Sequence, residues 1–138
     1  MIGPWVLTDA FRAKLADEGL RTSTASWKVA LFLSTSNLSV ASTTYAGVTA
    51  EHANGNGYTT GGVAVTLAVT GSTTVTVSLS AVPEFTASGG SIVARWAALY
   101  EVADDVAAFC LLDDTPADVT VLSGSTFELD STDVFVIS

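Results

Sequence analysis

The chain has 138 residues, of which 49% are hydrophobic and only 14% charged, and its mean hydropathy is +0.48. This length fits one domain with a single core, and so many apolar residues exclude a disordered chain. The net charge of −9 argues against direct nucleic-acid binding and against attraction to anionic lipid, because both need a basic surface. No apolar run approaches the length of a membrane-spanning helix.

The N-terminal segment predicts one short helix. Thr8 is a suitable N-cap, and Gly19 can adopt the left-handed conformation that ends a helix. Leu7, Phe11 and Leu15 recur every four residues and form one apolar stripe, which we expect to pack on a sheet or on another subunit. Arg12 and Lys14 then lie on the solvated side, where their charges can meet an acidic partner.

A buried strand and a long loop follow. Residues 27–33 are mostly apolar, which is typical of a strand that is buried on both faces. Residues 34–61 are rich in Ser, Thr, Asn and Gly, and two Asn-Gly pairs mark turns within them. A loop of this length in a small domain usually has a function or is mobile.

Alternating residues predict a β-hairpin over 63–80. Valine and leucine alternate with Thr, Ser and Ala on both sides of Gly71-Ser72, which suits a type II′ turn. The Thr, Ser and Ala face carries no charge, although edge strands usually carry charges that block pairing with another chain. Plain β-propensity of threonine explains this face equally well. If the face is functional, it lies under a second sheet or against another subunit, and its candidate contact residues are Thr66, Thr74 and Thr76.

Further strands are predicted at 91–101, 107–112, 119–122, 126–129 and 134–137, separated by turns rich in Gly, Asp and Pro. Strands at this spacing predict an all-β fold: a β-sandwich or jelly-roll-like barrel of about eight strands with one short N-terminal helix. We expect a single domain over 1–138, with an N-terminal arm and helix in 1–24 and the β-sandwich in 25–138.

Candidate reactive groups are sparse. Cys110 lies in an apolar strand, as a buried structural cysteine does, and the single His52 falls in a distant loop. One His and one Cys are too few for a zinc site. The acids near 104–105 and 113–118 are either solvated turn residues or calcium ligands, but they lack the alternating EF-hand pattern. We therefore predict a protein that is not an enzyme and needs no cofactor.

Aromatic residues supply further interface candidates. Trp27 and Trp96 fall within predicted strands and are expected in the core. Trp5 precedes the helix in an arm that we expect to be exposed, while Tyr45 and Tyr58 lie in the long loop. An exposed aromatic ring is a common anchor for a partner. The candidate interface residues are therefore Trp5, Phe11, Arg12, Lys14, Tyr45, Tyr58, Thr66, Thr74 and Thr76.

Three segments carry a resemblance to a known family. They are Trp27-Lys28-Val29-Ala30-Leu31-Phe32, Gly57-Tyr58-Thr59-Thr60-Gly61-Gly62 and Ala94-Arg95-Trp96-Ala97-Ala98-Leu99-Tyr100. In this order, over residues 7–138, the chain resembles small virion structural proteins of tailed bacteriophages. Trp96 stands where the family pattern has Tyr. No catalytic residue comes with this resemblance.

The resemblance implies a decoration (cement) protein on the outer surface of the phage head, which binds the major capsid protein and copies of itself, in trimers at local three-fold positions. The N-terminus lacks the pattern of a secretory signal, so we expect synthesis in the host cytoplasm. Two alternatives remain open. One is a tail, baseplate or head–tail connector protein that forms rings, and the other is a receptor- or carbohydrate-binding module that uses residues 34–61.

Overall fold

The computed structural model describes residues 1–20 and 25–138, so residues 21–24 of the predicted N-terminal segment lie outside it. The described residues form twelve strands, the α-helix α1 (Asp9–Asp17) and the 3-10 helix η1 (Tyr45–Gly47). The strands are β1 (Val6–Leu7), β2 (Trp27–Phe32), β3 (Val63–Val65), β4 (Leu67–Thr70), β5 (Val75–Leu79), β6 (Glu84–Thr86), β7 (Ile92–Ala94), β8 (Trp96–Glu101), β9 (Val106–Leu111), β10 (Val119–Val121), β11 (Thr126–Glu128) and β12 (Asp133–Ile137). The prediction of a mainly β fold is confirmed.

A five-stranded antiparallel sheet of order β1-β9-β8-β2-β3 forms the centre of the molecule. Strand β2 pairs with β8 along its whole length, from Trp27 opposite Glu101 to Phe32 opposite Trp96. Except for Lys28, the residues of β2 are buried, on both faces of the sheet, as their apolar run predicts.

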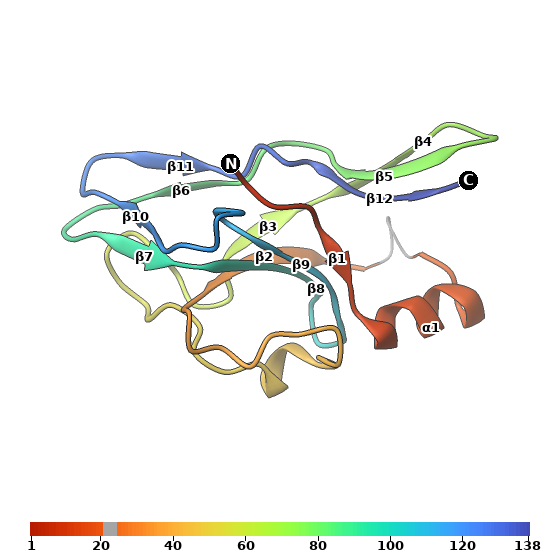
Figure 1. Ribbon diagram of the computed structural model, residues 1–138, viewed down its shortest axis with the longest axis horizontal. Coiled ribbons are helices and arrows are strands. Elements are labelled where there is room, and N and C mark those ends of the chain that lie inside the picture. Colours follow the sequence, from red (N-terminus) through yellow and green to blue (C-terminus); the bar gives the residue numbers. More distant parts are fainter. Residues whose placement is uncertain (21–24) are drawn as a thin grey trace.

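Two smaller antiparallel sheets, of order β12-β5-β4 and β11-β6, form an upper layer on one face of the central sheet (Figure 1). A third sheet, β10-β7, lies at one end of the central sheet, where β7 leads into β8. The chain bends from one sheet into another at Thr66, between β3 and β4, and at Arg95, between β7 and β8. The sheets stay separate and do not close, so the predicted eight-strand jelly-roll-like barrel is not confirmed.

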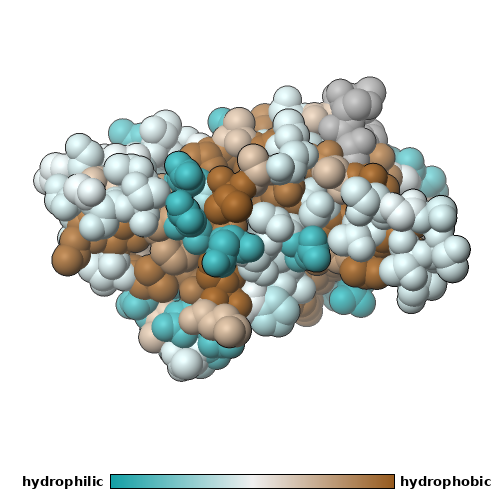
Figure 2. Space-filling model, turned by 90° about the horizontal axis from the view of Figure 1, so that it is seen from above, coloured by the Kyte–Doolittle hydropathy of each residue, from teal (hydrophilic) through white to brown (hydrophobic). Residues whose placement is uncertain are grey.

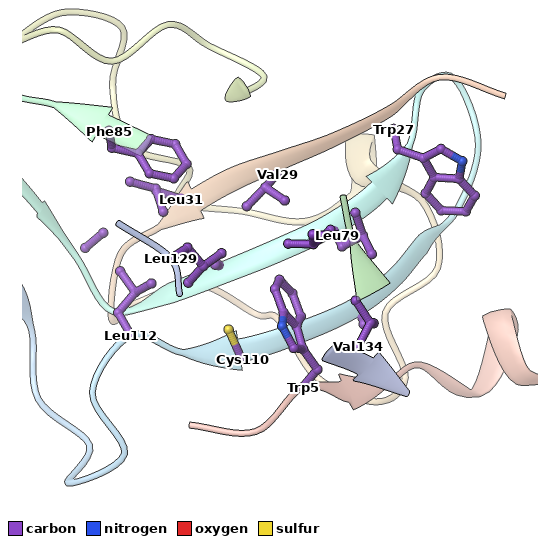
Figure 3. Packing of buried hydrophobic residues seen from close by; sticks show 14 of the residues in the cluster. Trp5, Trp27, Val29, Leu31, Leu79, Phe85, Cys110, Leu112, Leu129 and Val134 are labelled. Atoms are coloured by element: carbon purple, nitrogen blue, oxygen red, sulfur yellow. The ribbon is translucent and has the colours of Figure 1, made fainter. Parts of the chain in front are cut away.

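The main core lies between the upper layer and the central sheet. Every second residue of β2, including Val29 and Leu31, points into it, and Leu79 and Leu129 meet them from the upper layer (Figure 3). Cys110 lies among these side chains and is 1% exposed. It is a buried free cysteine, as the apolar run around it predicts.

The long loop covers the opposite face of the central sheet (Figure 1). We call residues 33–62 the covering loop. Leu38, Tyr45 and Val48 of this loop pack against Phe32 and other residues of a second apolar cluster. That cluster is completed by Ala30, Ala98, Tyr100, Val106 and Phe109. The covering loop is therefore a third layer of the fold.

The N-terminal helix forms as predicted. The Thr8 hydroxyl accepts a hydrogen bond from the Phe11 amide at 3.2 Å, and Gly19 follows the helix with a φ of +80°. The Thr8 hydroxyl also donates to the carbonyl of Val106 at 2.7 Å, which fixes the start of α1 against β9. The two-residue stretch before the helix pairs with β9 as β1, a contact too short to leave a periodic signal.

The hairpin forms with a longer loop than predicted. Strand β4 ends at Thr70 and β5 begins at Val75, so residues 71–74 make the connection and the prediction of a two-residue type II′ turn is wrong. Gly71 has a φ of +92°, and a Cβ there would lie 2.0 Å from the Thr74 carbonyl oxygen. Only glycine fits this tight corner.

Candidate interaction surface

A polar network lies where the covering loop meets the central sheet. Oε1 of the half-buried Glu51 accepts hydrogen bonds from the Tyr58 hydroxyl at 2.7 Å and from the Gly61 amide at 2.6 Å. Its Oε2 accepts a bond from the Tyr45 hydroxyl. The Tyr100 hydroxyl donates to the Gly61 carbonyl at 2.6 Å, and its ring stacks on that of Tyr45 at 4.2 Å. We call these five residues the tyrosine network.

The tyrosine network joins the three segments that carry the family resemblance. Tyr58 and Gly61 belong to the second segment and Tyr100 to the third. The first segment enters through Leu31, whose amide donates to the Tyr58 hydroxyl at 3.0 Å. Residues of these three segments therefore hold the covering loop onto the sheet.

The network resists ionisation of its phenols. Burial, and next the nearby carboxylate of Glu51, raise the pKa of Tyr100 to about 12. Burial is also the main cause that raises the pKa of Tyr45 and of Tyr58, with Glu51 adding to it. These tyrosines stay protonated at neutral pH, so Tyr45 and Tyr58 act as hydrogen-bond donors to Glu51 and Tyr100 to the Gly61 carbonyl.

Sequence reasoning did not single out Glu51. A usable signal existed, because Glu51 is the only acidic residue between Glu18 and Glu84. A lone carboxylate in a long polar loop, close to two tyrosines in the sequence, is a candidate acceptor for their hydroxyls.

Three of the predicted interface residues lie in the interior. Trp5 is 9% exposed and points into the main core, where its indole N–H donates to the Ser131 carbonyl at 2.7 Å (Figure 3). Phe11 packs edge-on against Trp27 and Phe135. Tyr58 is 3% exposed. The expectation of exposed anchors at Trp5 and Tyr58 is wrong, because β1 pairing draws the N-terminal arm into the sheet and the tyrosine network turns Tyr58 inward. Phe11 packs inside the molecule, which is one of the two outcomes expected for the apolar stripe of the helix.

Tyr45 is half-buried, with its hydroxyl on Glu51 and its ring on Tyr100. Neither tyrosine of the covering loop therefore presents an open ring on which a sugar could stack.

The two helical cations lie in different surroundings. Arg12 is exposed, as predicted. Lys14 is not on the solvated side, because its ammonium lies 3.3 Å from Glu101 and 2.5 Å from Asp104. Burial lowers the pKa of Lys14, but its bonds to Asp104 and Glu101 outweigh that effect and the pKa is raised. Lys14 therefore ties α1 to the turn after β8.

The predicted threonines lie on a surface without charge. Thr66 and Thr74 are exposed and Thr76 is half-buried on β5. No Asp, Glu, Lys or Arg occurs in residues 53–83. Seen from above, the end of the molecule that carries the β4–β5 hairpin is pale and brown over most of its surface, the colours of weakly polar and apolar residues (Figure 2). The hairpin itself therefore adds no charge to this end of the molecule.

The remaining candidate groups have ordinary partners. Burial raises the pKa of the Cys110 thiol to about 12. Asp118 pairs with Arg95 at 2.9 Å, and Asp113 accepts bonds from Thr115 in its own turn, which lower its pKa. Within residues 1–20 and 25–138, no three His, Cys, Asp or Glu side chains are grouped to hold a metal ion.

In the part of the chain that the structure describes, no helix is both long and apolar enough to span a membrane. Comparison with protein-family models, with curated proteins and with solved structures gave no match.

Proposed function

We propose that this protein is a structural component of a tailed-bacteriophage particle: a non-enzymatic decoration (cement) protein that binds the major capsid protein on the outer surface of the head. The observation that carries this proposal is the convergence of the three resemblance segments on the tyrosine network. Segments far apart in the sequence bond to one another through the residues that they share with the family. This supports a common fold, a β-sandwich built on the central sheet.

The surface chemistry fits a structural role. A decoration protein holds neighbouring shell subunits together through broad contacts, and many weak contacts add up over a symmetric shell. The uncharged hairpin and its exposed Thr66 and Thr74 offer such a contact surface. Arg12, exposed on α1, can meet an acidic patch of the capsid.

The carbohydrate-binding alternative loses its support from the aromatic residues. Tyr58 is in the interior, and Tyr45 has its hydroxyl and one ring face engaged. A sugar site built on aromatic stacking needs open rings.

Gold labelling of purified virions with an antibody against this protein tests the proposal. Label distributed over the heads is the expected result, and particles from a phage that lacks the gene are the control. Label confined to the tails would overturn the decoration role in favour of a tail or connector protein. Absence of label from intact and opened particles alike would overturn the virion assignment.

A further inference from the structure

The two edges of the three-stranded sheet β12-β5-β4 differ in how they are protected. The β12 edge has an irregular register between Asp133 and Phe135, carries the charge of Asp133, and packs Phe135 against Phe11 of α1. Bulges, charges and covering elements are the usual devices that stop an edge strand from pairing with another chain. Strand β4 has regular pairing throughout, no charge and no proline.

The outward hydrogen-bonding groups of β4 can be assigned from the register. The Ser80 amide donates to the Thr66 carbonyl, which makes Thr66 and Ser80 a hydrogen-bonded pair in line with the β4–β5 register. Bonded pairs alternate along an antiparallel ladder, so the backbone N–H and C=O of Val69 point away from β5. The sheet order places no further strand of the described residues beyond β4. The Val69 backbone is therefore open to a pairing strand.

The charge distribution singles out the β4 edge as the surface at which two copies of this chain can meet. Each chain carries a net charge of −9, so most approaches of two copies bring carboxylates together. All 5 basic and 14 acidic side chains lie outside residues 53–83. The β4 edge belongs to this uncharged stretch and lets two copies meet without bringing like charges together.

An apolar side chain on the β4 edge adds to this contact. Val69 is 51% exposed and lies opposite Val77, so both side chains are on one face of the sheet. In Figure 1 the hairpin end of this sheet projects beyond the central sheet. Pairing of two β4 strands about a two-fold axis brings the Val69 side chains of the two copies close together on that face.

We propose that two copies of the protein associate through their β4 edges, strand against antiparallel strand about a two-fold axis, to form a continuous six-stranded sheet. The inference goes beyond the proposed function and does not depend on it, because gold labelling reports the location of the protein and not its self-association.

A pair of proline variants tests this inference. Val69→Pro removes an outward N–H of β4 and leaves the β4–β5 hydrogen bonds intact. Val136→Pro is the matched control: Val136 is 55% exposed, lies opposite Thr76 on β12, and its N–H points outward at the other edge of the same sheet. Sedimentation equilibrium over a concentration series measures the mass of each purified full-length protein, and circular dichroism checks that each variant is folded.

We expect the wild type and Val136→Pro to approach twice the chain mass of 14.1 kDa as concentration rises, while Val69→Pro stays at the mass of one chain. A wild type that stays monomeric at every concentration, or that sediments as a trimer, overturns the proposal. Equal dissociation of the two variants, or of neither, overturns it as well. If Val69→Pro fails to fold, Val69→Lys against Val136→Lys gives the same comparison, since only Val69→Lys places a charge opposite its own copy across the two-fold axis.

Discussion

The central sheet is covered by strands on one face and by a loop on the other, and the two coverings are held by different forces. Toward the upper layer, apolar side chains such as Leu31 and Leu129 interdigitate, and both are 1% exposed or less. Toward the covering loop, a smaller apolar cluster is accompanied by the tyrosine network around Glu51. The stabilisation from hydrophobic burial grows with the apolar area that is buried, whereas a hydrogen-bonded carboxylate stabilises only the few groups that it contacts.

This difference explains how a long polar loop can serve as a layer of the fold. A loop poor in apolar residues cannot attach to a sheet through area alone. Glu51 compensates by holding two phenols and one backbone amide in place. We call the face of the central sheet toward the upper layer the upper face, and the face toward the covering loop the loop face. The free energy of unfolding should therefore respond to changes in side-chain volume on the upper face and to the loss of particular polar atoms on the loop face.

The largest effect is expected from Gly62→Ala, at the point where the covering loop enters β3. Gly62 has a φ of +79°, and a Cβ there would lie 1.9 Å from the Val29 carbonyl oxygen of β2. Because backbone blocks this Cβ, the loop must move off the sheet, and we expect the free energy of unfolding to fall by about 4 kcal/mol or more. Urea denaturation measures this loss.

Gly89→Ala separates the cost of backbone strain from the cost of the clash. Gly89 has a similar φ of +77° but nothing within 4 Å of a Cβ, so its variant should lose only about 1 kcal/mol. Equal losses for the two variants would show that close packing of the loop on β2 contributes nothing.

Leu129→Ala tests the upper face. This side chain is fully buried in the main core, so its truncation should lower the free energy of unfolding by about 3 kcal/mol. Leu38→Ala makes the same change in the covering loop, where the side chain is 7% exposed, and we expect a loss of about 2 kcal/mol because a loop relaxes around a cavity more readily. A larger loss for Leu38→Ala than for Leu129→Ala would reverse the comparison.

Glu51→Ala tests the loop face. The variant leaves the Tyr45 and Tyr58 hydroxyls and the Gly61 amide without their acceptor, and we expect a loss of about 2 kcal/mol in the free energy of unfolding. Glu84→Ala, at an exposed position of β6, is the control and should be neutral within about 0.5 kcal/mol. Hydrogen exchange of the Gly61 amide should accelerate in Glu51→Ala alone. Unchanged exchange there would contradict the role of Glu51 as the anchor of the loop.

Apolar periodicity was enough to predict much of the fold. Residues 27–33 and 107–112 read as buried strands, and both strands form in the central sheet. The same reasoning missed β1, which has only two residues, and β6, in which Phe85 is the single apolar residue between two polar ones. It also joined β3 to β4, since the alternation of 63–70 continues across Thr66, where the chain passes from one sheet to another.

The site could be predicted only where surface chemistry is visible in the sequence. The uncharged hairpin surface with Thr66 and Thr74 is present as expected. Burial of Trp5 was not foreseen, because it depends on the distant Ser131 carbonyl, and a single long-range hydrogen bond leaves no local pattern. Burial of Tyr58 was missed for another reason: its acceptor Glu51 is nearby in the sequence, but sequence reasoning did not use that signal.

Alkaline titration reports on the loop face selectively, because all 3 tyrosines of the chain belong to the tyrosine network. Burial raises the pKa of Tyr100 from the ordinary value of 10.0 to about 12. A pKa that is higher in the folded state means that the unfolded chain loses its phenolic proton first. The contribution of Tyr100 to the free energy of unfolding is therefore fully present below pH 10.0 and is lost as the pH rises through about 12.

We therefore expect little tyrosinate absorbance at pH 10.0 and a rise at higher pH that coincides with loss of the circular dichroism signal. Glu51→Gln removes the negative charge and should shift the rise to lower pH. Half-ionisation at pH 10.0 in a protein that is still folded would contradict a closed network.

The smallest change in the free energy of unfolding is expected from a Trp-to-Phe substitution, which we compare on the two faces of the central sheet. Trp5 lies on the upper face, and its indole N–H donates to the Ser131 carbonyl. Trp96 packs on the loop face against Phe109, and its buried indole N–H has no hydrogen-bond partner among the described residues. Trp5→Phe should lower the free energy of unfolding by about 1.5 kcal/mol, because a made hydrogen bond is lost.

Trp96→Phe should stay within about 0.5 kcal/mol of the wild type, because removal of an unsatisfied donor offsets the loss of ring area. Thermal and urea denaturation of both variants side by side measure the difference. If Trp96→Phe loses as much as Trp5→Phe, the Trp96 indole has a partner in solution, and the loop face is held by one more polar contact than the tyrosine network supplies.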